Sequence, residues 1–351
     1  MIRNLPFFLL AGLGLAPALT SAAVPSGFKP GVKWQIEIQS PLKTTGSLVP
    51  SDAVVWDIDL YFAAKNKDTI PYIRSQIPGA IIMCYFNAGL VQLSDCDYDS
   101  VWANSGLIST PHPDFPDERF VDVRKQQAIE LIQKRITLAN QIGCDAVDPD
   151  NIDTYIYDEG DDNTTFKLTR SDLVTFVKSL ATFAHSLTTL QGNTMLIGQK
   201  NAPELTTDVA SSLDFAVLEN CSGRNEPNTT PFCRTFQTPY IVAEKPVFNI
   251  EYPPSLSEGS SGCRDTGVTD ADYQGTCGNT TDKGGFSTVL KIKGGDRELN
   301  GCTQYCDAGG VGKGRVLTDT DPDAEGQCPP NALKMRSQRR SLRNRLRGGR
   351  I

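Results

Sequence analysis

Four aspartates stand within nine positions of one short stretch, GCDAVDPDNID at residues 143–153: Asp145, Asp148, Asp150 and Asp153. Carboxylates crowded in this way repel one another unless they are solvated, paired or used. Pro149 favours an extended backbone at the residue before it, so a strand here puts Asp148 and Asp150 on one face. The chain then turns at Asn151. The stretch predicts a group of acids where a strand ends.

Other short apolar segments of the chain also end in polar side chains. These are Asp57 and Asp59 in VVWDIDLYF, Tyr85 in MCYFNAG, Lys200 and Asn201 in IGQKN, Glu219 in DFAVLEN, and Asn249 and Glu251 in VFNIEY. Strands of a parallel barrel are normally apolar on both faces, so polar residues at their carboxyl ends indicate the wet mouth where barrel active sites are built. We expect these residues to surround one pocket.

Acids around a pocket suit the cleavage of glycosidic bonds. One ionised and one protonated carboxyl group are the minimum equipment for that reaction. The chain contains two histidines, His112 and His185, which we interpret as a solvated loop residue and a packing residue. Two histidines give little basis for a histidine-based catalytic triad or a multi-histidine zinc site. No phosphate-binding glycine motif follows an expected strand, which argues against nucleotide chemistry. We expect neither a cofactor nor a metal.

Two other interpretations of the acids remain open. Asp148, Asp150 and Asp153 offer the hard oxygen ligands that calcium prefers, although the stretch lacks the glycine and final glutamate of a helix-loop-helix calcium site. The cluster could also serve only as a turn. Asp57 and Asp59 fit substrate binding as well as buried ion pairs with Lys200 or Arg124. We expect Asp145 to be solvated.

The elements that must position these residues alternate between strand and helix. Expected strands lie at residues 34–39, 53–61, 80–86, 119–123, 146–150, 195–199, 214–219 and 247–252. The helical pattern of residues 124–143 ends at Gly143, which suits a left-handed cap, and Thr169 with Asp172 forms a capping box for a second helix. Eight strands with crossover helices predict an α/β fold, a (β/α)8 TIM barrel.

The chain of 351 residues divides into four expected parts. Residues 1–23 have the charge, apolar run and small residues of a signal peptide. Residues 24–254 form the barrel. Residues 255–333 contain half of the glycines and five of the ten cysteines, and we expect a Cys/Gly-rich, loop-rich extension that is either stapled by disulfides or of low order. Five is odd, so at least one of these cysteines pairs elsewhere or stays free. We expect residues 334–351 to be a basic, disordered tail, with binding of an anionic surface as the alternative.

Charge and targeting features limit the partners. The formal net charge is -7, and the tail carries eight Lys or Arg and no acid, so the body is more acidic still. An acidic body attracts cationic partners and disfavours nucleic acid. The early apolar run is too short for a membrane span. With sequons at Asn163, Asn228 and Asn279, we expect a secreted monomeric glycoprotein, released or held at the cell wall.

The strand ends taken together resemble a known family, the endo-alpha-1,4-polygalactosaminidases, which are secreted glycoside hydrolases with a (β/α)8 barrel. The matching stretches are VWDIDLYF, CYFNAG, ERFVDVR, GCDAVDPDNID, GQKNAPEL, DFAVLENC and KPVFNIEY, in the family's order over residues 28–253. The resemblance implies that Asp150 and Glu219 are the catalytic pair of a retaining mechanism, with Asp150 as nucleophile and Glu219 as acid/base. It also favours pairing of Cys221 with Cys233.

The sequence departs from the family at several points. The family's Glu-Pro-Asp-Asn begins here with Asp148, its Asn-Glu-Gln-Cys becomes LENC, and its Arg-x-Asp element appears only as SDCDYDS. These changes affect the expected substrate fit, because both catalytic carboxylates remain. A non-catalytic carbohydrate-binding barrel is the alternative.

The substrate that the resemblance implies is a polysaccharide of alpha-1,4-linked galactosamine, which is cationic where its amines are free. An acidic cleft attracts such a polymer. The expected substrate-binding residues are Asp57, Asp59, Tyr85, Asp148, Asn151, Asp153, Lys200, Asn201 and Glu251.

Overall fold

The computed structural model describes residues 24–112, 115–157, 166–223, 230–256, 268–278, 280–293, 299–306, 315–324 and 326–329. The expected signal peptide, the expected basic tail and the asparagines of all three sequons lie outside these residues.

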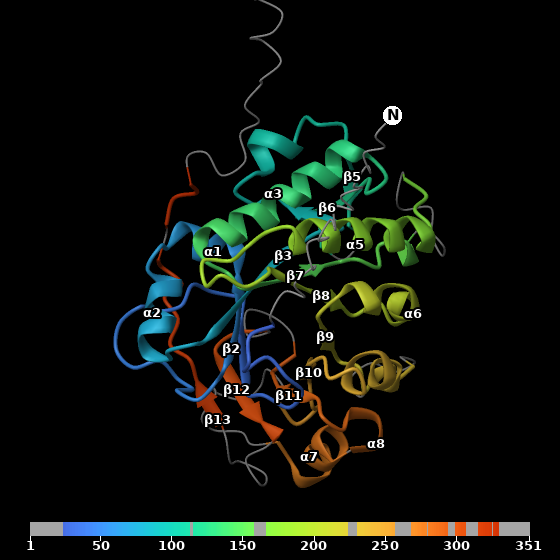
Figure 1. Ribbon diagram of the computed structural model, residues 1–351. Coiled ribbons are helices and arrows are strands. Elements are labelled where there is room, and N and C mark those ends of the chain that lie inside the picture. The colour runs from blue at the N-terminus through green and yellow to red at the C-terminus, as the bar shows by residue number, and fades with distance from the viewer. Residues whose placement is uncertain are drawn as a thin grey trace, which may run out of the picture.

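Eight parallel strands form the barrel sheet. In spatial order they are β1 (Trp34–Glu37), β2 (Val55–Asp59), β3 (Ile81–Asn87), β7 (Ala146–Asp150), β8 (Leu196–Lys200), β9 (Phe215–Glu219), β10 (Val247–Glu251) and β11 (Ser287–Leu290). The sheet curls so that β1 approaches β11 (Figure 1). The indole Nε1 of Trp34 donates to the carbonyl of Ser287 over 2.8 Å, and Lys291 Nζ donates to the carbonyl of Ile36 over 2.8 Å. These bonds link the first and last parallel strands and so close the TIM barrel.

Two strands differ from the sequence-based expectation. The segment expected at residues 119–123 is not a barrel strand: β6 (Glu118–Val121) pairs with β4 (Leu90–Gln92) and β5 (Ile108–Pro111) in a small antiparallel sheet. The eighth barrel strand is instead β11, which pairs in parallel with β10. It lies in the segment after residue 254 that we expected to be an extension. From there β12 (Cys302–Tyr305) and β13 (Arg315–Leu317) continue the sheet antiparallel.

The crossovers between barrel strands are uneven. After β2 come α1 (Leu60–Lys65) and α2 (Thr69–Gln76), and α3 (Gln126–Ile142) and α5 (Arg170–His185) precede and follow β7, side by side in Figure 1. Shorter helices serve the later strands: η1 (Tyr98–Trp102), η2 (Pro203–Leu205), α6 (Thr206–Val209), η3 (Ala210–Ser212), η4 (Cys233–Phe236), η5 (Gln237–Ile241), α7 (Asp270–Cys277) and α8 (Thr280–Lys283). No helix among the described residues has the length and apolar character needed to cross a membrane.

Both helix ends expected from the sequence are confirmed. Gly143 ends α3 with a left-handed φ of 105°, which a residue without Cβ adopts freely. Thr169 begins α5 with a complete capping box to Asp172. Gly143 therefore ends α3 three residues before β7, and Thr169 begins the helix that follows β7.

Four disulfides between pairs of described residues tie loops to this frame: Cys84–Cys144, Cys96–Cys328, Cys221–Cys233 and Cys277–Cys306. The expected pairing of Cys221 with Cys233 is confirmed. Cys328 pairs with Cys96, 232 positions earlier, so one cysteine of the late segment does bond outside it. The loop before η1 is thereby held against the end of the described chain.

Candidate active site

Three charged side chains meet at the carboxyl ends of neighbouring strands. Asp150 ends β7, Lys200 ends β8 and Glu219 ends β9. The Lys200 Nζ lies 3.3 Å from Asp150 Oδ1 and 3.4 Å from Glu219 Oε2. One ammonium group therefore bridges two carboxylates that are 69 positions apart in the sequence and holds them on the same side of the barrel.

Each carboxylate also receives a hydrogen bond from a tyrosine. The Tyr85 hydroxyl donates to Asp150 Oδ2 over 2.7 Å, and the Tyr252 hydroxyl donates to Glu219 Oε1 over 2.5 Å. The Asn151 backbone N–H donates to Asp150 Oδ1 over 2.8 Å. These bonds hold both side chains in place, and the exposed fractions of 17% for Asp150 and 25% for Glu219 leave each accessible from the mouth.

An asparagine with positive φ follows each of the three charged strand ends. The φ angles are 59° at Asn151, 44° at Asn201 and 52° at Asn220. Asparagine adopts this left-handed region more readily than most residues that carry a Cβ. The chain therefore turns sharply after Asp150, Lys200 and Glu219. These turns leave the charged side chains at the rim, and Asn201 Oδ1 accepts a 2.8 Å hydrogen bond from the Glu219 N–H.

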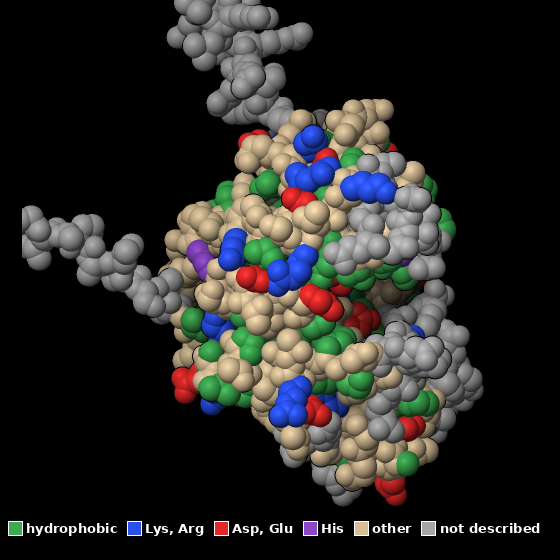
Figure 2. All heavy atoms as spheres, turned by 90° about the vertical axis from the view of Figure 1, so that its right-hand side faces the viewer, with side chains coloured by type: hydrophobic (Ala, Val, Ile, Leu, Met, Phe, Trp, Pro, Cys, Tyr) green, Lys and Arg blue, Asp and Glu red, His purple; other side chains and the backbone are tan. Residues whose placement is uncertain are grey.

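A cavity of about 780 Å³ lies over this group. Its acidic lining beyond Asp150 and Glu219 consists of Asp59, Asp95, Glu118 and Asp153. Its aromatic lining includes Phe115, whose side chain is 59% exposed, and Tyr157. Figure 2 shows acidic side chains gathered in a hollow of the molecule. The cavity offers carboxylates for cationic groups and flat rings for the apolar faces of sugars.

Burial keeps protons on several of these acids. It raises the pKa of Asp59 to about 7 and that of Asp153 to about 6. Burial alone lowers the pKa of Lys200, but the carboxylates of Asp150, Glu219 and Asp148 outweigh it and raise that pKa above its ordinary value. Lys200 is therefore a permanent cation in this site.

Two further aspartates lie directly beneath the group. Asp57 on β2 and Asp148 on β7 are completely buried, and no N–H or O–H donor of the described residues reaches any of their four carboxyl oxygens. Burial raises the pKa of Asp148 to about 7, and burial together with Asp148 raises that of Asp57 well above its ordinary value. Among the described residues neither Asp57 nor Asp59 forms the expected ion pair, because Lys200 pairs with Asp150 and Glu219 and Arg124 pairs with Asp122.

The structure brings together ten of the eleven residues expected in the site. Lining the cavity are Asp59, Tyr85, Asp150, Asn151, Asp153, Asn201 and Glu219, with Asp57, Asp148 and Lys200 buried below. Asp59 also caps α1 by accepting the Phe62 N–H over 2.7 Å. The exception is Glu251.

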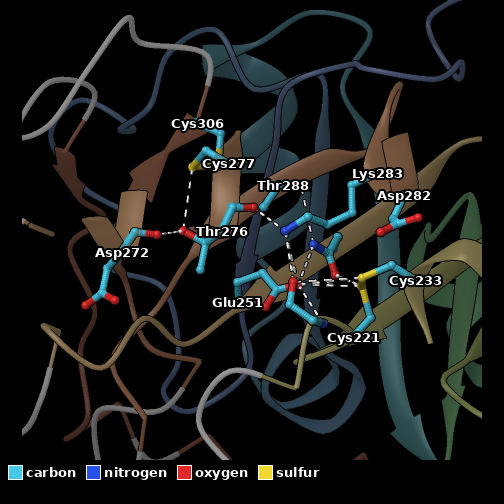
Figure 3. A network of polar contacts seen from close by, with 12 residues as sticks. Cys221, Cys233, Glu251, Asp272, Thr276, Cys277, Asp282, Lys283, Thr288 and Cys306 are labelled. Carbon is cyan, nitrogen blue, oxygen red and sulfur yellow. Dashed lines mark hydrogen bonds and ion pairs between the residues drawn. A yellow bond between two sulfur atoms is a disulfide. The ribbon is translucent and has the colours of Figure 1, made fainter. Parts of the chain in front are cut away.

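Glu251 points to the outer side of the sheet (Figure 3). Its Oε1 accepts from the Ser222 hydroxyl over 2.7 Å and from Asn249 Nδ2 over 3.1 Å, and it lies 3.6 Å from Lys283 Nζ beside the Cys221–Cys233 disulfide. The residue that reaches the mouth from this strand end is Tyr252. Neighbouring side chains of an extended segment point to opposite faces, so a polar strand end identifies the mouth only when its face is also assigned.

Two expectations outside the site are wrong. His112 is not solvated: it is 2% exposed and stacks on Phe120. Asp145 is 3% exposed and pairs with Arg74 over 2.8 Å, because the start of β7 is covered by α2. The sequence also missed Asp95, Glu118, Phe115 and Tyr157, which reach the cavity from loops and from the small sheet without a periodic signal.

A parallel barrel that carries paired carboxylates at the carboxyl ends of its strands has the architecture of a glycoside hydrolase. The family model of glycoside-hydrolase family GH114 matches residues 16–311, and the chain belongs to that family. This match confirms the resemblance found in the sequence, and the protein is a glycosidase of the endo-polygalactosaminidase type.

Solved structures agree. Aspergillus fumigatus Ega3, solved in complex with galactosamine, is 29% identical, with a TM-score of 0.63 over 82% of this chain and 100% of that chain. The glycoside hydrolase domain of PelA from Pseudomonas aeruginosa is 13% identical, with a TM-score of 0.50 over 83% of this chain and 99% of that chain, and shows the shared fold. A search of curated protein sequences finds no match.

Proposed function

We propose that this protein hydrolyses internal bonds of alpha-1,4-linked galactosamine polysaccharide, with retention of anomeric configuration. The observation that supports this most is the Lys200 bridge, which keeps Asp150 and Glu219 together at the floor of an acidic cavity. The galactosamine bound by Ega3 supports the sugar class. The acidic lining of the cavity suits a cationic polymer.

In this mechanism Asp150 attacks the anomeric carbon while Glu219 gives its proton to the departing glycosidic oxygen. The bond to Asp150 forms as the bond to that oxygen breaks, which leaves a glycosyl-enzyme. Glu219 then takes a proton from water, the hydroxide attacks the anomeric carbon, and Asp150 is released. Tyr85 and Tyr252 hold one oxygen of each carboxylate, so the acids keep their orientation through both steps.

The substrate amines are proposed to meet the outer acids. Asp59, Asp153 and Glu118 line the cavity beyond the reacting pair. A protonated amine lowers the pKa of an acid beside it, so binding of the polymer favours the ionised forms of Asp59 and Asp153. Phe115 and Tyr157 are proposed to support sugar rings at the cavity wall.

The test is an assay of new reducing ends on fully acetylated, partly acetylated and free-amine polymers. Cleavage is expected to rise with the fraction of free amines, because cationic residues complement the acidic cavity. Proton NMR of the first products is expected to show the alpha anomer before mutarotation. No cleavage of any polymer, together with retained binding, would support the non-catalytic sugar-binding alternative. Loss of activity in chelator would support a calcium site.

We further propose that the protein acts outside the cell as a monomer. The four disulfides of the described residues support an oxidising compartment. Residues 1–23 are proposed to direct export and to be removed, and the sequons are proposed to carry glycans. Mass spectrometry of the protein recovered from culture medium tests cleavage and glycosylation together.

A further inference from the structure

We propose that Asp57 and Asp148 share a proton beneath Lys200, and that this pair positions the Lys200 ammonium between the two catalytic carboxylates. The inference rests on the proposed function for its catalytic consequence. It goes beyond substrate contact, because neither aspartate reaches the cavity: both are 0% exposed.

Burial and the missing donors require a proton at this place. An ionised carboxylate without hydrogen-bond donors is strongly destabilised inside a protein. Asp57 and Asp148 receive no hydrogen bond from an N–H or O–H donor of the described residues, yet their carboxyl groups lie within hydrogen-bonding reach of each other. Carboxylates have only acceptor atoms, so such a contact is a hydrogen bond only when one of the two is protonated.

The sheet order explains how the two side chains meet. β3 separates β2 from β7, so Asp57 and Asp148 approach one another through the barrel interior rather than along the sheet. Both belong to the inward face: Asp57 is two positions before Asp59, and Asp148 is two positions before Asp150. The pair thus lies one layer below the mouth.

The proton belongs mainly to Asp57. Its neighbours are Asp148 and Asp150 from β7 and Lys200 from β8, and burial together with Asp148 keeps its pKa well above the usual range. The charged neighbours of Asp148 are Lys200, Asp150, Asp57 and Glu219. The charge of Asp148 also contributes to the raised pKa of Tyr85 on β3. Asp57 therefore donates to Asp148, which carries the negative charge above a pH of about 7.

This arrangement gives Lys200 a third anionic neighbour. The ammonium is drawn by Asp150 and Glu219 at the mouth and by Asp148 from below. Because Asp148 attracts the ammonium from below, Lys200 keeps its position while the Asp150 carboxylate is bound covalently in the glycosyl-enzyme and is then released. Without the negative charge of Asp148, the Lys200 ammonium could move toward either Asp150 or Glu219. It would then no longer lie between the two catalytic carboxylates.

Two substitutions of Asp57 distinguish the effect of its hydrogen-bond donor from the effect of its side-chain volume. Asp57→Asn keeps a donor to Asp148, whereas Asp57→Leu removes it and leaves Asp148 alone. We expect kcat to fall by about tenfold or more in Asp57→Leu with a smaller change in KM, and the acid limb of its pH profile to move to higher pH. Asp57→Asn should recover most of the loss. Equal impairment in both variants would overturn the proposal.

The matched control is Asp145→Asn, which changes another buried aspartate, immediately before β7. Its carboxylate pairs with Arg74 at the opposite end of the barrel. We expect lower stability and an unchanged pH profile of kcat. A shift in this profile as large as that of Asp57→Leu would show that any disturbance of β7 has the same effect, and the proposal would fail.

Infrared difference spectroscopy tests the proton without any assay. At a pH of about 8, above the Asp148 pKa of about 7, the wild type should show the carbonyl band of a protonated carboxyl group that is absent in Asp57→Asn. Absence of this band in the wild type would disprove the shared proton even if the enzyme is active. Its presence in a protein that cleaves no polymer would uphold the proton and refute the proposed function.

Discussion

Lys200 supplies the positive charge that allows the carboxylates of Asp150 and Glu219 to lie close together. Two carboxylates at short range repel, and the proton that one must carry would be shared unpredictably between them. A buried cation 3.3 Å from Asp150 and 3.4 Å from Glu219 cancels much of this repulsion.

Replacing Lys200 with methionine should reduce kcat by about 10²–10³, the range typical for loss of one preorganised electrostatic group. The two carboxylates would repel each other more strongly, and the pH dependence of kcat would change. Steady-state kinetics across pH measure both effects.

Lys33→Met is the control for loss of a lysine. Lys33 pairs with Asp52, whose side chain is 67% exposed, and both residues precede the amino ends of β1 and β2, whereas the site lies at the carboxyl ends of the strands. It should leave the pH profile unchanged. A Lys200→Met variant that folds and keeps kcat within about twofold of the wild type would contradict the bridging role.

At the scale of elements, β9 and β10 are joined by a buried charge network behind Glu219. Glu251 and Lys283 have side-chain exposures of 0% and 3%, and both contact Ser222 in the turn after Glu219. Figure 3 shows Lys283 reaching from α8 toward Glu251. The network therefore connects the late segment of the chain to the turn that holds a catalytic residue.

Glu251→Gln should lower the free energy of unfolding by about 3–5 kcal/mol, because it removes a carboxylate that lies 3.6 Å from the buried Lys283 ammonium. Adding Lys283→Met to this variant also removes the buried ammonium and should recover part of the loss. Urea unfolding of both single variants and the double variant measures the coupling. Additive losses would show that the two residues do not depend on each other.

The elements with a clear period could be predicted from the sequence, and the others could not. The capping box at Thr169 and the glycine end of α3 are local signals, so both were predicted correctly. β6 resembles a barrel strand in its residues, and only its antiparallel partners in the small sheet reveal its role. β11 lies in a glycine-rich segment, where pairing with β10 outweighs a weak local preference.

The site shows the same division. Residues at strand ends could be placed because the barrel topology brings those ends together. Glu251 was misplaced because it adjoins Tyr252 and points the other way. Phe115 and Glu118 come from the small sheet and its loop, whose position over the mouth depends on tertiary contacts.

For the whole molecule, several buried acids should make the fold more stable in mild acid. The pKa values of Glu37, Asp59 and Asp148 are raised to about 7 and that of Asp153 to about 6, all mainly by burial. The folded chain therefore binds more protons than the unfolded chain between these values and the ordinary ones. Because the folded chain binds these extra protons, the free energy of unfolding decreases as pH rises through that window.

Urea unfolding from about pH 4.5 to about pH 7.5 should show a steady decrease in the free energy of unfolding. General repulsion in an acidic protein acts in the same direction but is screened by salt, so the series is repeated at high ionic strength. A decrease that persists in salt supports buried acids as the cause. A rise in stability over this range would contradict the protonation states given for them.

The central claim is that Asp150 and Glu219 perform the chemistry together. The most direct test is the kcat of Asp150→Asn and Glu219→Gln on free-amine polymer, with thermal unfolding to show that both variants are folded. Each should lose a factor of about 10²–10⁴ or more while still binding the polymer. A folded variant of either kind that keeps activity within about tenfold of the wild type would contradict the assignment.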